Sequence, residues 1–248
     1  MIDKNILQHD LFPRSNKYDP EWIMKNQMGP HPLWLTEFLV QKFDLKPGMR
    51  VLDLACGKGI TSVFLAKEFG VQVYAVDLWD APNEKWENAK AHGVEHLITP
   101  IQADAKNLPF APGFFDAIIC VNSYMYFGQD DAYLENILKF LRPGGQIGMI
   151  VNGYPKETPE NIPDYLLEFL GEDQLWTWKS LSWYRELWKK YGLVSIDTAD
   201  TLPNACDLLI RYEAAHLAYN TSWDDESDIY EADNGEYIGL IRLVATKK

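Results

Sequence analysis

Short apolar runs alternate with stretches of helical spacing through the middle of this chain. The apolar runs lie at 50–55, 71–76, 98–104, 114–121 and 146–151. Between them, apolar residues recur at helical spacing over 60–69, 83–92 and 131–141. Nearly continuous apolar runs of this length are typical of strands buried on both faces of a parallel sheet. Strands that alternate with helices in this way predict a doubly wound α/β sheet.

The pattern changes at both ends of the chain. Asp19 and Pro20 form a good helix entry, with Asp as the cap and Pro at the first helical position. Beyond Val151 the alternation loosens and the chain becomes rich in Pro, Glu and Trp. The further elements expected are helices at 21–27, 33–43, 181–191 and 207–219 and strands at 193–199 and 237–245. No repeat or linker interrupts the sequence, which predicts a single domain over residues 1–248.

A glycine turn ends the first apolar run. Gly57 and Gly59 flank Lys58 directly before the helical stretch at 60–69. Glycine lets the backbone bend tightly and approach a ligand closely because it has no Cβ. Asp53 lies at the carboxyl end of the strand, where open α/β sheets bind their ligands.

Acidic residues follow the next two strands. Asp77 ends the second strand, 77 − 59 = 18 residues after Gly59, and can accept hydrogen bonds from both hydroxyls of a ribose. The alternative for Asp77 is a helix cap. Asp104 ends the third strand, where it is either an acceptor for an adenine amino group or a loop cap. The fourth strand ends in a polar and aromatic segment, 122–127.

Two nucleotide-binding patterns compete for the glycine turn. Dinucleotide enzymes need Gly-x-Gly-x-x-Gly to bring a pyrophosphate to a helix N-terminus. Here the third glycine is replaced by Ile60, and no Tyr-x-x-x-Lys pair occurs in the chain. Both observations disfavour a nicotinamide-dependent oxidoreductase, which we keep as an alternative.

Several motifs, taken in order, resemble class I S-adenosylmethionine-dependent methyltransferases. They are Val51–Gly59, Val76-Asp77, Asp104-Ala105, Phe115–Ile118 and Leu141–Gly145. The resemblance is strong from about 45 to 152, and the flanks more weakly resemble a bacterial small-molecule branch. It implies a seven-stranded, mostly parallel sheet with an antiparallel last strand. It further implies a lid at 1–44, a cofactor-binding core at 45–152, and a substrate cover with the last two strands at 153–248.

The resemblance assigns S-adenosylmethionine as the cofactor and gives it a set of residues. These are Tyr18, Asp53, Ala55, Gly57, Gly59, Asp77, Leu78, Trp79, Asp104, Ala105 and Asn122. In the family the first loop position is glycine, and this chain has Ala55. We expect its methyl group to be tolerated through a negative φ.

Each part of the cofactor has its own residues in this assignment. Asp53 and the glycines would hold the methionine portion, and Asp77 the ribose. Leu78, Trp79, Asp104 and Ala105 would surround the adenine, and Asn122 would lie beneath the sulfonium. Tyr18 and Trp22 would either close over the cofactor or pack in the core.

Methyl transfer from a sulfonium is an in-line displacement, so the protein mainly aligns the reactants and excludes water. A base is needed only if the nucleophile arrives protonated. The candidates are Tyr124, Tyr126, Glu213 and His216, each of which could instead shape the pocket or pack. The fourth strand lacks the Asn-Pro-Pro-aromatic motif that holds planar amides or base amines, which favours a small amine, thiol or hydroxyl acceptor. Aromatic residues of the cover would suit a cationic or aromatic acceptor: Trp176, Trp178, Trp183 and Trp223.

Composition narrows the possible partners. The formal net charge of −13 speaks against nucleic acid and against an anionic membrane surface. The three cysteines are isolated and give no zinc signature, so we expect no metal and a reducing, cytoplasmic location. The N-terminus lacks the apolar centre of a signal peptide. A non-catalytic protein that binds the same cofactor is a further alternative, and the oligomeric state stays open.

Overall fold

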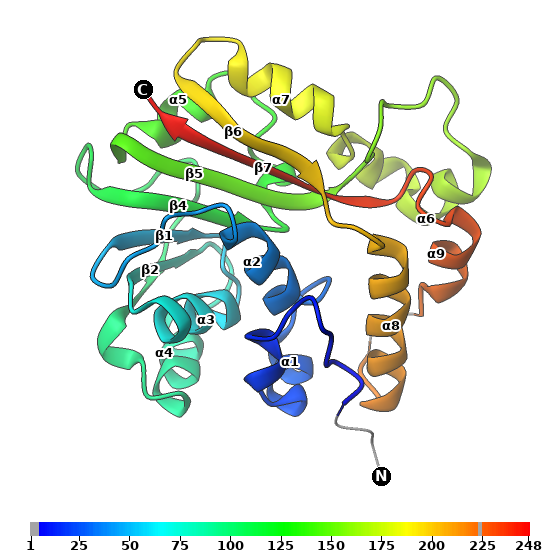
Figure 1. Ribbon diagram of the computed structural model, residues 1–248, viewed down its shortest axis with the longest axis horizontal. Helices are drawn as coiled ribbons and strands as arrows, with labels where there is room; N and C mark the ends of the chain where they lie inside the picture. The colour runs from blue at the N-terminus through cyan, green and yellow to red at the C-terminus, as the bar shows by residue number, and fades with distance from the viewer. Residues whose placement is uncertain (1–4, 223–224) are drawn as a thin grey trace.

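The computed structural model describes residues 5–222 and 225–248, which form a seven-stranded sheet with helices on both faces (Figure 1). The strands are β1 (Arg50–Leu54), β2 (Gln72–Asp77), β3 (Ile98–Gln102), β4 (Phe115–Val121), β5 (Leu141–Gly153), β6 (Val194–Thr201) and β7 (Gly239–Lys247). The helices are α1 (Pro20–Asn26), α2 (Pro32–Val40), α3 (Ile60–Phe69), α4 (Pro82–Ala91), α5 (Tyr133–Leu138), α6 (Asp164–Gln174), α7 (Leu181–Lys189), α8 (Ala205–Ala218) and α9 (Ser227–Asp233).

The strand order is β3-β2-β1-β4-β5-β7-β6. Strands β1 to β5 pair in parallel, and β7 runs antiparallel between β5 and β6. The predicted fold class is therefore confirmed. The chain order reverses between β1 and β4, and ligands of open α/β sheets bind at the carboxyl ends of the strands beside such a point.

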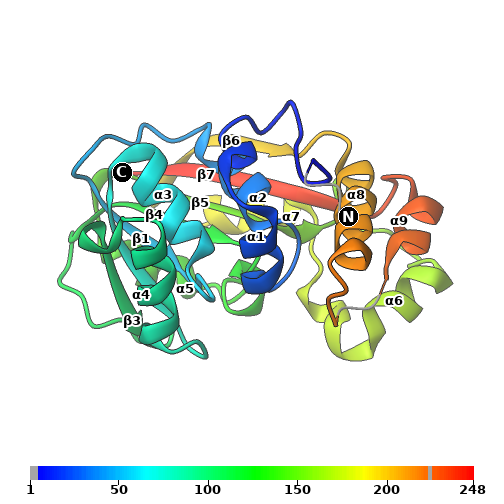
Figure 2. The ribbon, with the colours of Figure 1, turned by 90° about the horizontal axis from the view of Figure 1, so that it is seen from below.

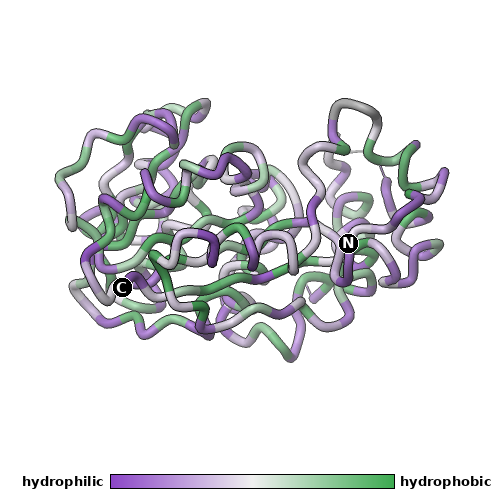
Figure 3. The backbone as a smooth tube through the Cα atoms, turned by 90° about the horizontal axis from the view of Figure 1, so that it is seen from above, coloured by the Kyte–Doolittle hydropathy of each residue, from purple (hydrophilic) through white to green (hydrophobic). Residues whose placement is uncertain are grey.

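The sheet is buried on both faces by two apolar clusters. Alternate residues of one strand point to opposite clusters: Val51 contributes to the cluster that holds α2, α3 and α8, and Leu52 to the one that holds α5 and α7. Figure 2 shows α1, α2 and α3 together on one face. In Figure 3 the hydrophobic colour follows the central strands, while much of the periphery is hydrophilic. This explains why the strands are continuous apolar runs.

Several element boundaries differ from the predicted ones. Helix α2 ends at Val40 rather than at residue 43, because the Lys42 and Phe43 N–H groups donate to carbonyls only three residues back, as in a turn. The helix predicted at 131–141 shortens to α5, since the Phe140 carbonyl accepts from the Phe115 backbone N–H at the start of β4. Strand β3 ends at Gln102, because Asp104 already begins the following turn through hydrogen bonds from Lys106 and Asn107.

The N-terminal segment is fixed to the domain by one buried carboxylate. Glu37 of α2 accepts hydrogen bonds from the backbone N–H groups of Arg14 and Ser15 and from the Ser15 hydroxyl, at 2.7–3.1 Å. Asp19 caps α1 by accepting from the Glu21 N–H at 3.0 Å, as predicted. The chain thus reaches the loop before α2 in a defined path. No helix within the described residues is long and apolar enough to cross a bilayer.

Candidate cofactor and acceptor site

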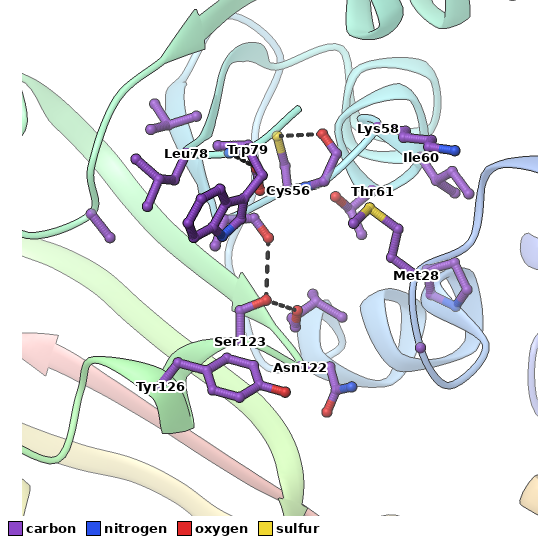
Figure 4. A pocket seen from close by; sticks show the side chains of 18 of the residues that line it. Met28, Cys56, Lys58, Ile60, Thr61, Leu78, Trp79, Asn122, Ser123 and Tyr126 are labelled. Carbon is purple, nitrogen blue, oxygen red and sulfur yellow. Dashed lines mark hydrogen bonds between the residues drawn. The ribbon is translucent and has the colours of Figure 1, made fainter. Parts of the chain in front are cut away.

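A cavity of about 470 Å³ opens at the carboxyl ends of β1, β2 and β4, and we call it the main cavity (Figure 4). Its walls are the loop before α2, the glycine turn, and the segments after β2, β3 and β4. The lining residues lie at 26–30, 32, 55–58, 60–61, 76–79, 103–106, 121–123 and 126–127. The volume is that of a typical small-molecule site.

The glycine turn has a left-handed backbone at alternate positions. Ala55, Gly57 and Gly59 have φ values of 55°, 53° and 82°. The expectation of a negative φ at Ala55 is therefore wrong. A residue with a Cβ pays about 1–2 kcal/mol in this region, and such strain often lies at binding sites. Ala55 is held there because the neighbouring Cys56 N–H donates to the Val76 carbonyl at 3.0 Å and Gly59 N–H donates back to the Cys56 carbonyl.

Gly57 also leaves room for a neighbouring side chain. A Cβ on Gly57 would lie 2.7 Å from the Met28 sulfur, which reaches over the turn from the loop before α2. Met28 is half exposed and points into the main cavity (Figure 4). Gly59 does not line the main cavity; it begins α3 and packs above Lys85.

Asp53 does not line the main cavity; it lies beneath the turn and is 1% exposed. Its Oδ2 accepts from the hydroxyls of Thr61 and Ser62 at 2.5 and 2.6 Å, and its Oδ1 has no partner among the described residues. Burial raises the pKa of Asp53 to about 6, against the opposing effect of the two hydroxyl donors. A buried carboxylate oxygen without a donor is expected to meet one from a ligand.

Asp77 fixes two loops at once. Its Oδ2 accepts from the Gly57 N–H at 2.8 Å, and its Oδ1 accepts from the N–H groups of Trp79 and Asp80 at 2.8 and 3.0 Å. A carboxylate has about four lone-pair sites, so one is left on Oδ2. The carboxylate lines the main cavity and can take one further donor. Asp77 therefore ties the glycine turn to the loop after β2, and it does not cap α4, whose N-cap residue is Ala81.

A buried lysine that the sequence did not single out balances these carboxylates. Lys85 of α4 is 1% exposed, and its ammonium donates to the Asp80 carbonyl at 2.5 Å. Its charge opposes the burial effect on the pKa of Asp53 and of Asp80. Little in the sequence indicated that Lys85 is buried, because a lone lysine in a polar helix normally lies in solvent.

The segments after β2 and β3 form the opposite wall of the main cavity. Leu78, Trp79, Asp104 and Ala105 all line it, and Trp79 is 82% exposed at its rim. Asp104 Oδ1 accepts from the Lys106 N–H at 2.8 Å, so the loop-cap alternative describes part of its role. Its place in the lining leaves the other oxygen for a ligand.

Asn122 and Tyr126 lie on the side of the cavity opposite Cys56 and Thr61 (Figure 4). Asn122 has φ 51°, and its Oδ1 accepts from the Asn152 N–H at 3.4 Å. Its Nδ2 lies 3.0 Å from where a Cβ on Gly29 would be, so the amide closes against the loop before α2.

Tyr18 and Tyr124 lie outside the main cavity and are buried, which agrees with the packing alternative that the sequence left open for each. Tyr18 packs against Trp22 and Phe64, and its hydroxyl donates to Glu68 at 3.5 Å. Tyr124 is 1% exposed and packs edge-on against Trp188. Burial raises the pKa of both hydroxyls far above the usual value, and it also raises the pKa of the Tyr126 hydroxyl.

Glu213 and His216 lie on α8 and do not line the main cavity either. Burial raises the pKa of Glu213 to about 7, and nearby Glu226 adds to the effect. Burial lowers the pKa of His216, whose Nδ1 lies 2.7 Å from the Thr221 hydroxyl. Of the four base candidates, the structure brings only Tyr126 to the main cavity.

The predicted cover is also absent from this lining, in which no described residue follows Phe127. Trp178 is buried against Tyr154, and Trp183 packs against Tyr184. Trp176 is half exposed, and Trp223 lies outside the described residues. Residues 26–30 form a wall of the main cavity instead, and the sequence indicated this segment only as a helix break.

Comparisons with known proteins define the class. Residues 51–145 match the sequence family described as "Methyltransferase domain". The geranyl diphosphate C-methyltransferase of Streptomyces coelicolor A3(2) has the same fold, with a TM-score of 0.72 at 17% identity over 100% of this chain and 89% of that chain. Residues 51–145 therefore match the methyltransferase family, and the chain as a whole shares the fold of this methyltransferase.

Curated relatives match part of the chain. The glycine/sarcosine/dimethylglycine N-methyltransferase of Actinopolyspora halophila is 28% identical over 160 residues, 64% of this chain and 28% of that protein. The ubiquinone/menaquinone biosynthesis C-methyltransferase UbiE of Shewanella piezotolerans is 33% identical over 146 residues, 56% of each protein. The match thus spans less than two thirds of either relative.

Proposed function

We propose that this protein is an S-adenosylmethionine-dependent methyltransferase that acts on a small molecule. The observation that carries the proposal is Asp53 Oδ1, a buried acceptor beneath the glycine turn that has no partner among the described residues. In the same turn, a Cβ on Gly57 would collide with the Met28 sulfur. That arrangement suits an ammonium group above the turn. The family match over residues 51–145 supports the same cofactor.

Residues that line the main cavity, together with Asp53 beneath the glycine turn, would hold the cofactor part by part. Asp53 would hold the ammonium and Asp77 one ribose hydroxyl, through its remaining lone pair. Leu78 and Trp79 would cover the adenine, and Asp104 would accept from its amino group. No phosphate is involved, which agrees with a wall that carries carboxylates.

The bound cofactor would supply a methyl group already activated by its sulfonium charge. The chain would then orient the acceptor and keep water out, and such orientation contributes roughly 7–11 kcal/mol to the barrier. Asn122 and Tyr126 are the polar residues placed to orient an acceptor, since both face the cavity from the end of β4. Of the four base candidates, Tyr126 alone lines the cavity. It would act as a base only for an acceptor that must lose a proton during methyl transfer.

The acceptor is proposed as a small molecule with an amine, thiol or hydroxyl. One relative is named as an N-methyltransferase of glycine, sarcosine and dimethylglycine, and another as a C-methyltransferase of ubiquinone and menaquinone biosynthesis. Both names point to small molecules, but the methylated atom differs. A panel of amines, thiols and phenols, incubated with radiolabelled S-adenosylmethionine, tests the transfer. Label in one acceptor class supports the proposal. Cofactor binding without transfer to any acceptor would instead support the non-catalytic alternative.

A further inference from the structure

A second, much smaller cavity lies behind the loop that walls the main cavity. It has a volume of about 10 Å³ and lies between α2, α8 and the start of β7. Pro30 lines both cavities, so this one residue separates them. The polar residues in its lining are His31, Trp34 and Tyr212, and the rest is apolar, mostly leucine.

Each of these three side chains is buried and has one polar atom without a hydrogen-bond partner among the described residues. His31, Trp34 and Tyr212 are 2%, 2% and 1% exposed. No described residue pairs with His31 Nε2, Trp34 Nε1 or the Tyr212 hydroxyl. An unpaired buried polar group costs about 1–3 kcal/mol, so three in one place call for a shared partner.

The chemistry of the three groups specifies that partner. His31 Nδ1 accepts from the Trp34 backbone N–H at 3.2 Å, so the imidazole proton is on Nε2. Burial lowers the pKa of His31 to about 3, which keeps the ring neutral. His31 Nε2 and Trp34 Nε1 are therefore both donors, and the Tyr212 hydroxyl can donate or accept. The missing partner must accept two hydrogen bonds and form a third.

The rings are close enough to share one small partner. His31 stacks on Trp34 with centroids 4.1 Å apart, and Tyr212 lies 5.2 Å from His31 and 6.3 Å from Trp34. A water molecule needs about 10–15 Å³ and two to four polar neighbours. The small cavity meets both conditions.

We propose that the small cavity binds one ordered water, which accepts from His31 and Trp34 and donates to Tyr212, and that this water fixes the loop wall of the main cavity to α8. His31 and Tyr212 are then positioning residues for whatever binds in the main cavity. The loop needs such an anchor. Residues 28–30 make no hydrogen bond to another described element, and Gly29 N–H donates only to Gln27 Oε1 within the loop.

The part of the proposal that concerns ligand binding rests on the proposed function, whereas the water itself does not. Tyr212→Phe removes the hydroxyl with little change in ring volume. Tyr184→Phe is the matched control, because the Tyr184 side chain is also fully buried but packs on the other face of the sheet. S-adenosylhomocysteine is the probe in calorimetry.

We expect affinity for the probe to fall about 3–10-fold in Tyr212→Phe and to stay unchanged in Tyr184→Phe. A crystal structure of the wild type at high resolution should show one water in the small cavity. The Trp34 indole N–H resonance, assigned by its loss in Trp34→Phe, should exchange slowly in the wild type and shift in Tyr212→Phe.

An empty small cavity in the crystal, or equal affinities in the two tyrosine variants, overturns the proposal. If the wild type does not bind S-adenosylhomocysteine, the proposed function fails. The crystal and the Trp34 resonance then still decide whether the water is present. The two failures are therefore separate.

Discussion

Asp77→Asn tests whether one carboxylate both builds the site and binds the cofactor. The carboxylate accepts three backbone N–H groups, from Gly57, Trp79 and Asp80. An Asn side chain can keep the pair on one oxygen, but its amide N–H₂ then meets the Gly57 N–H donor to donor. The variant therefore loses one charge-assisted bond and leaves Gly57 unpaired.

The size of both effects follows from those contacts. Hydrogen bonds to charged groups contribute about 1.5–3 kcal/mol, so we expect the free energy of unfolding to fall by roughly 1.5–3 kcal/mol. The ribose hydroxyl would lose a charged acceptor as well, which we expect to weaken binding by about 1–3 kcal/mol, or roughly 5–150-fold. Urea unfolding measures the first quantity and calorimetry with S-adenosylhomocysteine measures the second.

Asp104→Asn is the control, because Asp104 accepts a single backbone N–H, from Lys106. Its stability should fall by less than about 1 kcal/mol. If Asp77→Asn lowers stability but leaves affinity unchanged, the carboxylate is structural alone and the ribose assignment is wrong. Unchanged stability would contradict the hydrogen-bond account itself.

Three further predictions concern buried and strained groups. Burial raises the pKa of Asp53 to about 6, and a bound ammonium would lower it, so Asp53 should release a proton when the cofactor binds and cofactor affinity should rise from pH 5 to 7. Calorimetry in two buffers of different ionisation enthalpy checks the proton release. Asp53→Asn should abolish the pH dependence of affinity. The pKa of Glu213 is raised to about 7, above its unfolded value, so its charge destabilises the fold as pH rises from about 4.5 to 7. Glu213→Gln should then be more stable than the wild type by about 1–2 kcal/mol at pH 8 and by less at pH 5 in thermal unfolding; equal stability at pH 8 would contradict the burial argument. Ala55→Gly should raise the free energy of unfolding by about 0.5–1 kcal/mol by relieving a φ of 55°, and a loss of stability would show that the turn is not strained.

The sheet and its polar strand ends were predictable because both depend on local patterns. Buried strands read as apolar runs, and the residue after each run, such as Asp77, must lie at the same edge of the sheet. The seven-stranded, mostly parallel sheet with its antiparallel last strand followed from the family resemblance, whereas the order of the strands was not predicted, since periodicity alone does not order strands. The cavity-facing positions of Leu78 and Asp104 followed from the same placement.

The remaining features depend on contacts between distant parts of the chain. The loop at 26–30 lines the main cavity because Glu37 and the first helices carry the N-terminal segment across the sheet, and no local pattern records that path. The sequence left open whether Tyr18 closes over the cofactor or packs, and its ring packs beside Phe64. The sign of φ at Ala55 is set by the hydrogen bond of its neighbour to β2, which a sequence motif does not show.

The most direct test of the central claim is calorimetric titration of the wild type with S-adenosylmethionine, S-adenosylhomocysteine and NAD under the same conditions. We predict that both sulfur compounds bind at one site per chain and that NAD does not bind. Binding of NAD alone, or of none of the three, would contradict the account.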